Sequence, residues 1–228
     1  MIDLENYSSL KLGDSSRHLH ARKKMIRLQI QARGVKDLLV LQAIEAVPRH
    51  RFVRENMEKA AYDDTPLPIG ENQTISQPYI VAYMTEALGL MGHERVLEVG
   101  AGSGYQAAVL AEIVAQVYTV EINENLAIEA ALRLKKMGCT NVRLRFGDGY
   151  KGWSDEAPFD GIVVTAAPNH IPQTLVDQLK VGGKMVIPVG ESEQELVLVT
   201  RLADGSYRKD ARIPVRFVPM IRQREQNN

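Results

Sequence analysis

Short apolar runs alternate with longer amphipathic segments from residue 94 onward. The apolar runs are rich in Val and Ile and end at glycine, acidic or small residues, as buried parallel strands often do. The segments between them space their apolar residues as helices do. We predict strands over 95–100, 116–122, 142–149, 159–167, 184–190, 194–202 and 213–220, and helices over 105–115, 126–138 and 171–183. This alternation predicts a doubly wound α/β fold, with a mostly parallel sheet of about seven strands and helices on both faces.

The first part of the chain has a different pattern. Residues 1–65 show helical spacing and no convincing strand, so we predict a helical N-terminal extension. Its basic run, 17–24, is interpreted as a solvated helix face. Residues 66–93 are predicted to form a loop, marked by prolines and a glycine, and then an amphipathic helix over 80–88. We therefore expect a single domain, 1–228, organised as 1–65, 66–93 and 94–228.

Composition narrows the class of protein. Hydrophobic residues make up 45% of the chain and charged residues 25%, the balance of a globular domain. The formal net charge is zero, which disfavours broad binding to nucleic acid. Cys139 is the only cysteine, so an intramolecular disulfide and a multi-cysteine zinc site are excluded. No leader pattern and no membrane-spanning apolar run stands out, and we expect a cytoplasmic protein.

The turn after the first predicted strand carries Gly100, Gly102 and Gly104, the spacing G-x-G-x-G. A dinucleotide-binding turn has G-x-G-x-x-G/A, which would require a small residue at Tyr105. The spacing therefore argues against a nicotinamide cofactor. Taken alone, a glycine-rich turn could also be no more than a tight connection.

Acidic residues follow the next two predicted strands. Glu121, after the second strand, could accept hydrogen bonds from both hydroxyls of a ribose. Asp148, after the third, could accept one from an adenine amino group. Each has a simpler alternative: an exposed glutamate, or an Asp-Gly turn. Ligands of such sheets bind beyond the carboxyl ends of the strands, so together these residues indicate an adenosine-containing ligand.

Several segments then resemble one family. They are PRHRFV (48–53), QTISQP (73–78), VLEVGAGSGYQAAVLA (96–111), GDGYKGW (147–153), APFDGIVVTAAP (157–168), GGKMVIPVG (182–190) and VRFVPM (215–220). The chain resembles the protein-L-isoaspartate O-methyltransferases of bacterial type, which belong to the class I S-adenosylmethionine-dependent methyltransferases and have a Rossmann-like fold. The resemblance covers most of the chain from residue 48 onward.

The resemblance implies a repair reaction. The enzyme would transfer a methyl group from S-adenosylmethionine to the free α-carboxylate of an isoaspartyl residue in a damaged protein or peptide, and the ester would then close to a succinimide. A carboxylate with a pKa of roughly 3.3–3.9 is already ionised at neutral pH, so the reaction needs no general base and no metal. The partners would be damaged proteins, with no nucleic acid or membrane, and we expect a monomer.

The resemblance also implies site residues. Ser76 would be the active-site serine that orients the carboxylate by donating a hydrogen bond, and Thr74 and Ile75 would line the same pocket. Val215, Phe217 and Val218 would contact the substrate peptide through backbone groups. Residues 66–93 become the acceptor loop and helix, and 94–228 the cofactor-binding core with a C-terminal substrate segment. The cofactor residues would be Gly100, Ala101, Gly102, Ser103, Gly104, Glu121, Ile122, Asp148 and Gly149.

Alternatives remain open at this stage. Ser76 could be an N-cap, with Ile75 and Ile80 as a hydrophobic staple. Another methyltransferase acting on RNA or a small molecule is possible, although the neutral charge and the absence of an N/D-P-P-Y/F motif disfavour a nucleic-acid amine. A non-catalytic S-adenosylmethionine sensor is a third reading, but it would not need the TISQP segment. The five histidines show no metal-ligand spacing, and each is interpreted as surface or structural.

Overall fold

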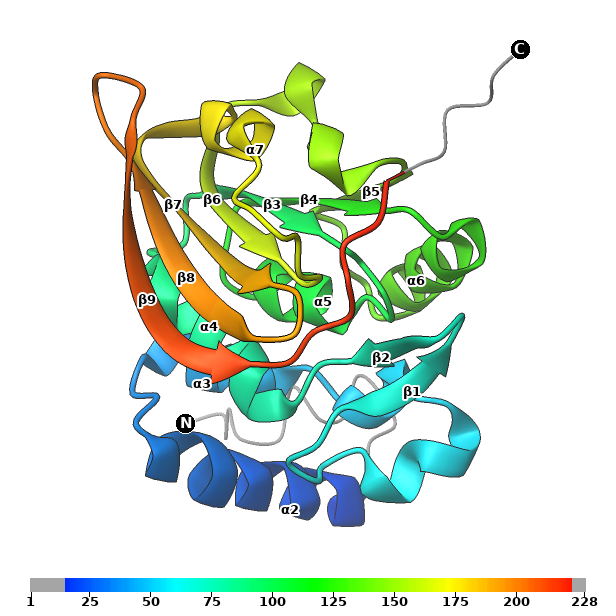
Figure 1. Ribbon diagram of the computed structural model, residues 1–228. Coiled ribbons are helices and arrows are strands. Elements are labelled where there is room, and N and C mark those ends of the chain that lie inside the picture. The colour runs from blue at the N-terminus through cyan, green and yellow to red at the C-terminus, as the bar shows by residue number, and fades with distance from the viewer. Residues whose placement is uncertain (1–14, 223–228) are drawn as a thin grey trace.

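The computed structural model describes residues 15–222 and shows a sheet between two layers of helices (Figure 1). The seven strands stand in the order β5-β4-β3-β6-β7-β8-β9. β3 to β7 run parallel, whereas β8 is antiparallel to both of its neighbours. Their bounds are β3 Arg95–Val99, β4 Gln116–Glu121, β5 Val142–Phe146, β6 Phe159–Val164, β7 Leu179–Gly190, β8 Gln194–Arg201 and β9 Tyr207–Val215. The predicted doubly wound, mostly parallel sheet is confirmed.

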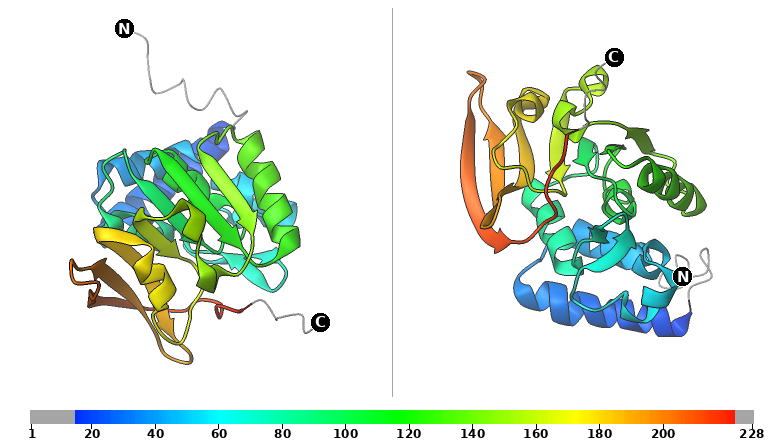
Figure 2. Two further views of the ribbon diagram at one scale, coloured as in Figure 1. Left: turned by 90° about the horizontal axis from the view of Figure 1, so that it is seen from above. Right: turned by 45° about the vertical axis from the view of Figure 1, so that its right-hand side comes forward.

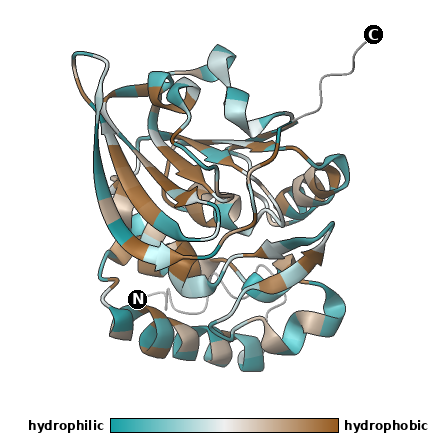
Figure 3. Cartoon of the chain, viewed as in Figure 1, coloured by the Kyte–Doolittle hydropathy of each residue, from teal (hydrophilic) through white to brown (hydrophobic). Residues whose placement is uncertain are grey.

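Successive residues of a strand point to opposite faces of the sheet and so contribute to two hydrophobic cores, one on each face. In β3, Val96 packs into the core shared with the N-terminal helices, and the next residue, Leu97, packs into the core on the opposite face. Residues pointing to one side of a strand recur with period two, so near-continuous apolar strands bury both faces of the sheet. Figure 3 shows hydrophobic residues concentrated in the central strands. The helices that cover the sheet are α4 Pro78–Leu88, α5 Tyr105–Ala111, α6 Glu124–Lys136 and α7 Gln173–Asp177.

The N-terminal region forms a layer beside the first core, below the sheet in Figure 1. Its helical elements are α2 Ser16–Met25, η1 Ile26–Ile30, η2 Gln31–Arg33, α3 Leu38–Ala46, η3 Arg49–Phe52 and η4 Glu55–Ala60. The interpretation of 17–24 as a solvated face is wrong at Arg22, which is 3% exposed and donates a hydrogen bond to the Tyr62 hydroxyl.

Residues 66–93 contain a hairpin that the sequence did not reveal. β1 Leu67–Gly70 pairs antiparallel with β2 Gln73–Ile75, where a loop was predicted. Glu71 and Asn72 at its tip both have positive φ, the conformation of a type I′ turn. The hairpin leads directly into α4, so the chain enters that helix from an extended strand.

Two predicted elements near the end of the chain have different bounds. The helix predicted over 171–183 stops at Asp177, and β7 begins at Leu179. Gly182 and Gly183, where the helix was predicted to end, lie in an irregular stretch of β7. The last strand covers 207–215 and not 213–220. After β9 the chain runs back across the end of the sheet, where Pro219 forms a parallel bridge with Ala167 (Figures 1 and 2).

Among residues 15–222, no helix has both the length and the apolar character needed to span a membrane.

Candidate active site

A pocket lies at the carboxyl ends of β3, β4 and β6, against the β1–β2 hairpin and the segment after β9. It brings together parts of the chain far apart in sequence, which is where ligands of doubly wound sheets bind. Of the predicted residues, those that line this pocket are Thr74, Ile75, Ser76, Gly100, Ala101, Gly102, Ser103, Glu121, Ile122, Gly149 and Val218. Gly104 and Asp148 lie behind the lining, and Val215 and Phe217 line a neighbouring groove.

Gly100 shows why the turn after β3 needs glycine. Its φ is +96°, and an added Cβ would lie 2.4 Å from the hydroxyl oxygen of Thr165. That hydroxyl can donate its one proton to the Gly100 carbonyl oxygen at 2.7 Å or to the Val99 carbonyl oxygen at 3.0 Å. The missing side chain at Gly100 therefore lets β6 hold the ligand-facing turn in place. Gly104 is the N-cap of α5 at a φ of +88°, and a Cβ there would also lie 3.3 Å from Leu134 in α6.

Glu121 ends β4 and is 5% exposed. The Gly102 N–H donates to its Oε2 at 2.8 Å, and the Asn123 N–H donates to its Oε1 at 2.9 Å. A carboxylate has about four acceptor positions, so each oxygen can still accept a ligand hydroxyl. Glu121 thus positions the glycine turn and also faces the pocket, which is compatible with the ribose-binding role predicted from its place in the sequence.

Asp148 has a local role in the structure. Its Oδ1 accepts a hydrogen bond from the Tyr150 N–H at 2.9 Å, capping the short 3₁₀ turn η5, Gly149–Lys151. The side chain is 6% exposed, and only the following residue, Gly149, lines the pocket. The alternative reading, an Asp-Gly turn, therefore describes the contacts present, and a contact with an adenine stays a prediction.

Glu98 is a pocket residue that the sequence reasoning did not assign. It is fully buried in β3 and pairs in register with Thr119, whose hydroxyl donates to Glu98 Oε2. Its other oxygen, Oε1, makes no hydrogen bond of good geometry among the described residues, although the Ala107 N–H lies near enough to the carboxyl group to favour its ionised form. Burial raises the pKa of Glu98 from 4.5 to about 8, and the nearby negative charge of Glu121 acts in the same direction. Its place directly before the glycine turn was the available signal.

A groove of about 470 Å³ adjoins the pocket. Four residues line both cavities, and they are Thr74, Ser76, Thr165 and Val218. A group transferred from a ligand in the pocket to one in the groove would pass between these residues. Thr165 directly follows β6 and was not assigned from the sequence.

Ser76 is half-buried between β2 and α4. The alternative that Ser76 is the helix N-cap is wrong: the N-cap is Gln77, whose φ and ψ are −51° and 137°, and Pro78 occupies the first turn. Gln77 makes no side-chain capping bond, and its Nε2 donates to the Asp64 carbonyl oxygen at 3.0 Å. Ser76 is therefore placed at the junction of the two cavities for a reason other than capping.

The segment after β9 is held by Gln194. The Phe217 N–H donates to Gln194 Oε1 at 2.6 Å, and Gln194 Nε2 donates to the Phe217 carbonyl oxygen at 3.1 Å. The Val218 carbonyl oxygen accepts from the Ala167 N–H at 2.8 Å. Both backbone groups of Phe217 are thus engaged within the chain, and the expectation that Phe217 contacts a substrate peptide through its backbone stays a prediction. A peptide in the groove would meet the Phe217 side chain.

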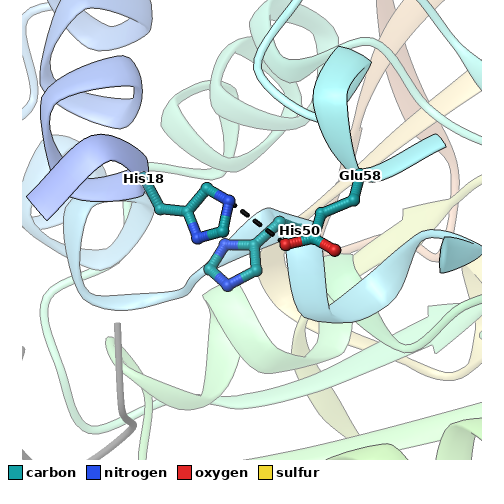
Figure 4. A group of neighbouring side chains, drawn as sticks. All are labelled: His18, His50 and Glu58. Atoms are coloured by element: carbon teal, nitrogen blue, oxygen red, sulfur yellow. Dashed lines mark ion pairs between the residues drawn. The ribbon is translucent and has the colours of Figure 1, made fainter. Parts of the chain in front are cut away.

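A second cluster lies away from the strand ends, between α2 and the 3₁₀ turns (Figure 4). His18 and His50 stack with ring centroids 3.9 Å apart, and His18 Nε2 lies 3.2 Å from Glu58 Oε1. Potential ligand atoms of these three residues lie within 4.8 Å of one another, although their sequence spacing gave no such signal. His50 Nδ1 is engaged with the Tyr62 hydroxyl at 2.7 Å. These contacts join α2 to the turns η3 and η4.

Comparison with known proteins agrees with this geometry. The sequence profile described as protein-L-isoaspartate(D-aspartate) O-methyltransferase (PCMT) matches residues 20–225. The chain belongs to this family. It is 52% identical over 96% of its length to protein-L-isoaspartate O-methyltransferase 2 of Shewanella sediminis, covering 91% of that protein. It is 54% identical over 89% of its length to a protein-L-isoaspartate O-methyltransferase of Opitutus terrae, covering 88% of it.

Solved structures extend the family likeness to the fold. A protein-L-isoaspartate O-methyltransferase superposes with a TM-score of 0.80 at 28% identity, over 87% of this chain and 65% of that one. A Plasmodium falciparum protein named for the same activity, in complex with S-adenosyl-L-homocysteine, superposes with a TM-score of 0.76 at 25% identity, over 90% of this chain and 99% of that one. The resemblance to this family and the predicted Rossmann-like fold are confirmed.

The isoaspartate methyltransferase family implies S-adenosylmethionine as cofactor, and the pocket suits it. The buried Oε1 of Glu98 provides an acceptor for a cationic ligand. Glu121 provides acceptor positions for hydroxyls, and the turn from Gly100 to Ser103 lines the pocket directly. These residues would hold the donor, and the four shared residues would direct its methyl group toward the groove.

Proposed function

We propose that this enzyme transfers a methyl group from S-adenosylmethionine to the free α-carboxylate of L-isoaspartyl residues in damaged proteins and peptides. The product ester then closes to a succinimide, which begins repair. The observation that carries the proposal is the junction at Ser76 between the pocket at the strand ends and the adjoining groove, within a chain of this family. A groove open to solvent suits a residue presented by a peptide chain.

The reaction requires little chemistry from the protein. When bound, the donor supplies an electrophilic methyl carbon and a neutral thioether as leaving group. A carboxylate oxygen of the substrate forms the new O–CH₃ bond, while the S–CH₃ bond breaks and its electron pair stays on sulfur. No proton is transferred, because the acceptor is already ionised. The protein must align the reacting atoms and exclude water.

Ser76 and its neighbours are suited to alignment. The Ser76 and Thr74 side chains line both cavities and can donate hydrogen bonds without carrying charge. A neutral donor orients the carboxylate and leaves most of its electron density available for attack. Ser76 is therefore a catalytic residue as a hydrogen-bond donor, not as a nucleophile. Ile75, which is buried, closes one wall of the pocket.

The test compares two peptides that differ only in the linkage of one aspartate. Purified enzyme with methyl-labelled S-adenosylmethionine should place base-labile label on the isoaspartyl peptide and not on its normal twin. Label on neither peptide, with tight cofactor binding, would support the sensor instead. Label on an RNA or a small molecule alone would support a different methyltransferase.

The proposal includes finer statements. The organisation into residues 1–65, 66–93 and 94–228, the monomeric state, the lack of a nucleic-acid partner and the cytoplasmic location stay predictions from the sequence. Sedimentation of the purified enzyme, with and without an isoaspartyl protein, would test the monomer directly.

A further inference from the structure

The groove beyond Ser76 has walls of two kinds. The side nearest the reaction is neutral and consists of the four residues shared with the cofactor pocket. Farther out, Arg33 from the N-terminal region and Arg216 from the segment after β9 line it. No aspartate or glutamate lines the groove among the described residues. Arg33 is paired with Asp64, which is not a lining residue, so the lining itself carries positive charge and no negative charge.

Arg33 is held in place by two contacts. Its guanidinium carbon lies 3.4 Å from the centroid of the Tyr79 ring, and its NH1 lies 2.9 Å from Asp64 Oδ2. Arginine has five N–H donors in a planar fork, so one ion pair leaves donors on the other nitrogens for a ligand. The Arg33 side chain is 44% exposed. It is therefore both oriented and accessible.

Arg216 lines the groove from the segment that follows β9. It is exposed and follows Val215, the last residue of β9. The next residue, Phe217, has both backbone groups bonded to Gln194, which fixes the position of the segment that carries Arg216. Within residues 15–222, no ion pair neutralises Arg216.

We infer that the groove is a charge-selective subsite that favours isoaspartyl peptides with an acidic side chain flanking the damaged residue, recognised by Arg33 and Arg216. The inference rests on the proposed methyl transfer, because it needs the isoaspartyl carboxylate at the junction. The arginines stand outside the junction, so they can bind a neighbouring carboxylate without quenching the attacking one.

The magnitude follows from the exposure of both arginines. An exposed ion pair changes an equilibrium by up to about fivefold, and it weakens as salt rises. One such pair with a flanking Glu, together with repulsion of a flanking Lys, predicts that kcat/KM for the Glu-flanked peptide exceeds that for the Lys-flanked peptide by about three- to tenfold. A Gln-flanked peptide should fall between them. The difference should lie mainly in KM, because the flanking side chain does not touch the reacting atoms.

The experiment measures methyl transfer to peptides with a central isoaspartate, in which one flanking position at a time carries Glu, Gln or Lys. Arg33→Gln and Arg216→Gln should each lower the Glu-to-Lys ratio, and the double variant should bring it near one. Arg27→Gln and Arg212→Gln are matched controls, since both arginines are exposed and neither lines the groove. These controls should keep the wild-type ratio.

Two results would overturn the inference: equal kcat/KM for the Glu and Lys peptides in the wild type, or a ratio that survives in the double variant. Arg33→Gln loses the contact with Tyr79, and if it fails to fold, Arg216→Gln alone decides. Failure of the wild type to methylate even the Gln-flanked isoaspartyl peptide would instead refute the methyltransferase proposal, and this inference with it.

Discussion

Glu98 offers a sharp test of the cofactor pocket, because a titratable group is buried where a cationic donor is expected. Burial raises its pKa to about 8, although the hydrogen bond from Thr119 acts in the opposite direction. At pH 7 about nine in ten molecules without ligand therefore carry a neutral Glu98. A positive charge bound nearby favours the carboxylate, so cofactor binding should release a proton.

The size of the effect follows from the pKa. Below about pH 7 the ionised fraction of Glu98 changes about tenfold per pH unit. If the donor binds only the ionised form, its dissociation constant falls by up to about tenfold from about pH 6 to about pH 7. Binding at pH 7 then releases up to about 0.9 protons per cofactor. Glu98→Gln keeps the volume of the side chain and its acceptor for Thr119, but it cannot ionise.

The assay is titration calorimetry with S-adenosylmethionine in two buffers of different ionisation enthalpy. The wild type should show proton release and a pH-dependent dissociation constant. Glu98→Gln should show neither, and should bind several-fold more weakly than the wild type near about pH 7.5. A flat wild-type profile, or the same slope in both proteins, would refute this account of Glu98.

The same pKa determines how the stability of the ligand-free enzyme depends on pH. The folded pKa of Glu98 lies above its value of 4.5 in an unfolded chain, so its contribution is fully present below about pH 4.5. That contribution is lost as the pH rises through about 8. The melting temperature should therefore fall between about pH 6 and pH 8.5, and it should fall less in Glu98→Gln. Excess S-adenosylmethionine should oppose the fall in the wild type.

Three further predictions concern neighbouring residues. Ser76→Ala should lower kcat by about 10-fold to 100-fold with cofactor affinity within about twofold, and an equal loss of both in calorimetry would make Ser76 structural. Glu121→Gln should weaken cofactor binding by about tenfold, because neutral hydrogen bonds are weaker than charged ones; unchanged affinity would refute a hydroxyl-binding role. Gly100→Ala should lower stability to urea by about 1–3 kcal/mol, since its Cβ would meet Thr165 at a positive φ. Thr165→Ser, which keeps the hydroxyl, should leave stability nearly unchanged, and a comparable loss would contradict the packing argument.

The sequence predicted the parallel core well because each strand is buried on both faces. The runs at Val96 and Val117 are apolar apart from Glu98 and Thr119, which are themselves buried, and each run is followed by a segment with helical spacing. The prediction from sequence failed where one local pattern is compatible with two different structures. Gly182 and Gly183 looked like a helix end, yet they form an irregular stretch of β7, because pairing with β6 extends the strand back to Leu179.

The site was predicted unevenly for the same reason. The turn around Gly100 and the acid Glu121 could be identified because both follow strands in regular order. Thr165 carried no signal of its own, since its importance comes from lining the same two cavities as Ser76, which is far away in the sequence. The clustering of His18 with His50 likewise depends on packing between elements 32 positions apart, and no spacing rule reports it.

The arrangement of charge around the junction fits the chemistry of the acceptor. A carboxylate needs no base, and an ion pair to its attacking oxygen would slow the transfer by stabilising the ground state more than the transition state. The residues shared by pocket and groove, Ser76 among them, are all neutral, whereas Glu98 lies on the donor side and Arg33 lies on the far side of the groove. Glu98 is thus placed to bind the donor and Arg33 to bind the acceptor peptide, and neither lies at the junction where the new bond forms. A base at the junction would suit an alcohol or amine acceptor, so its absence among the lining residues described favours an acid as substrate.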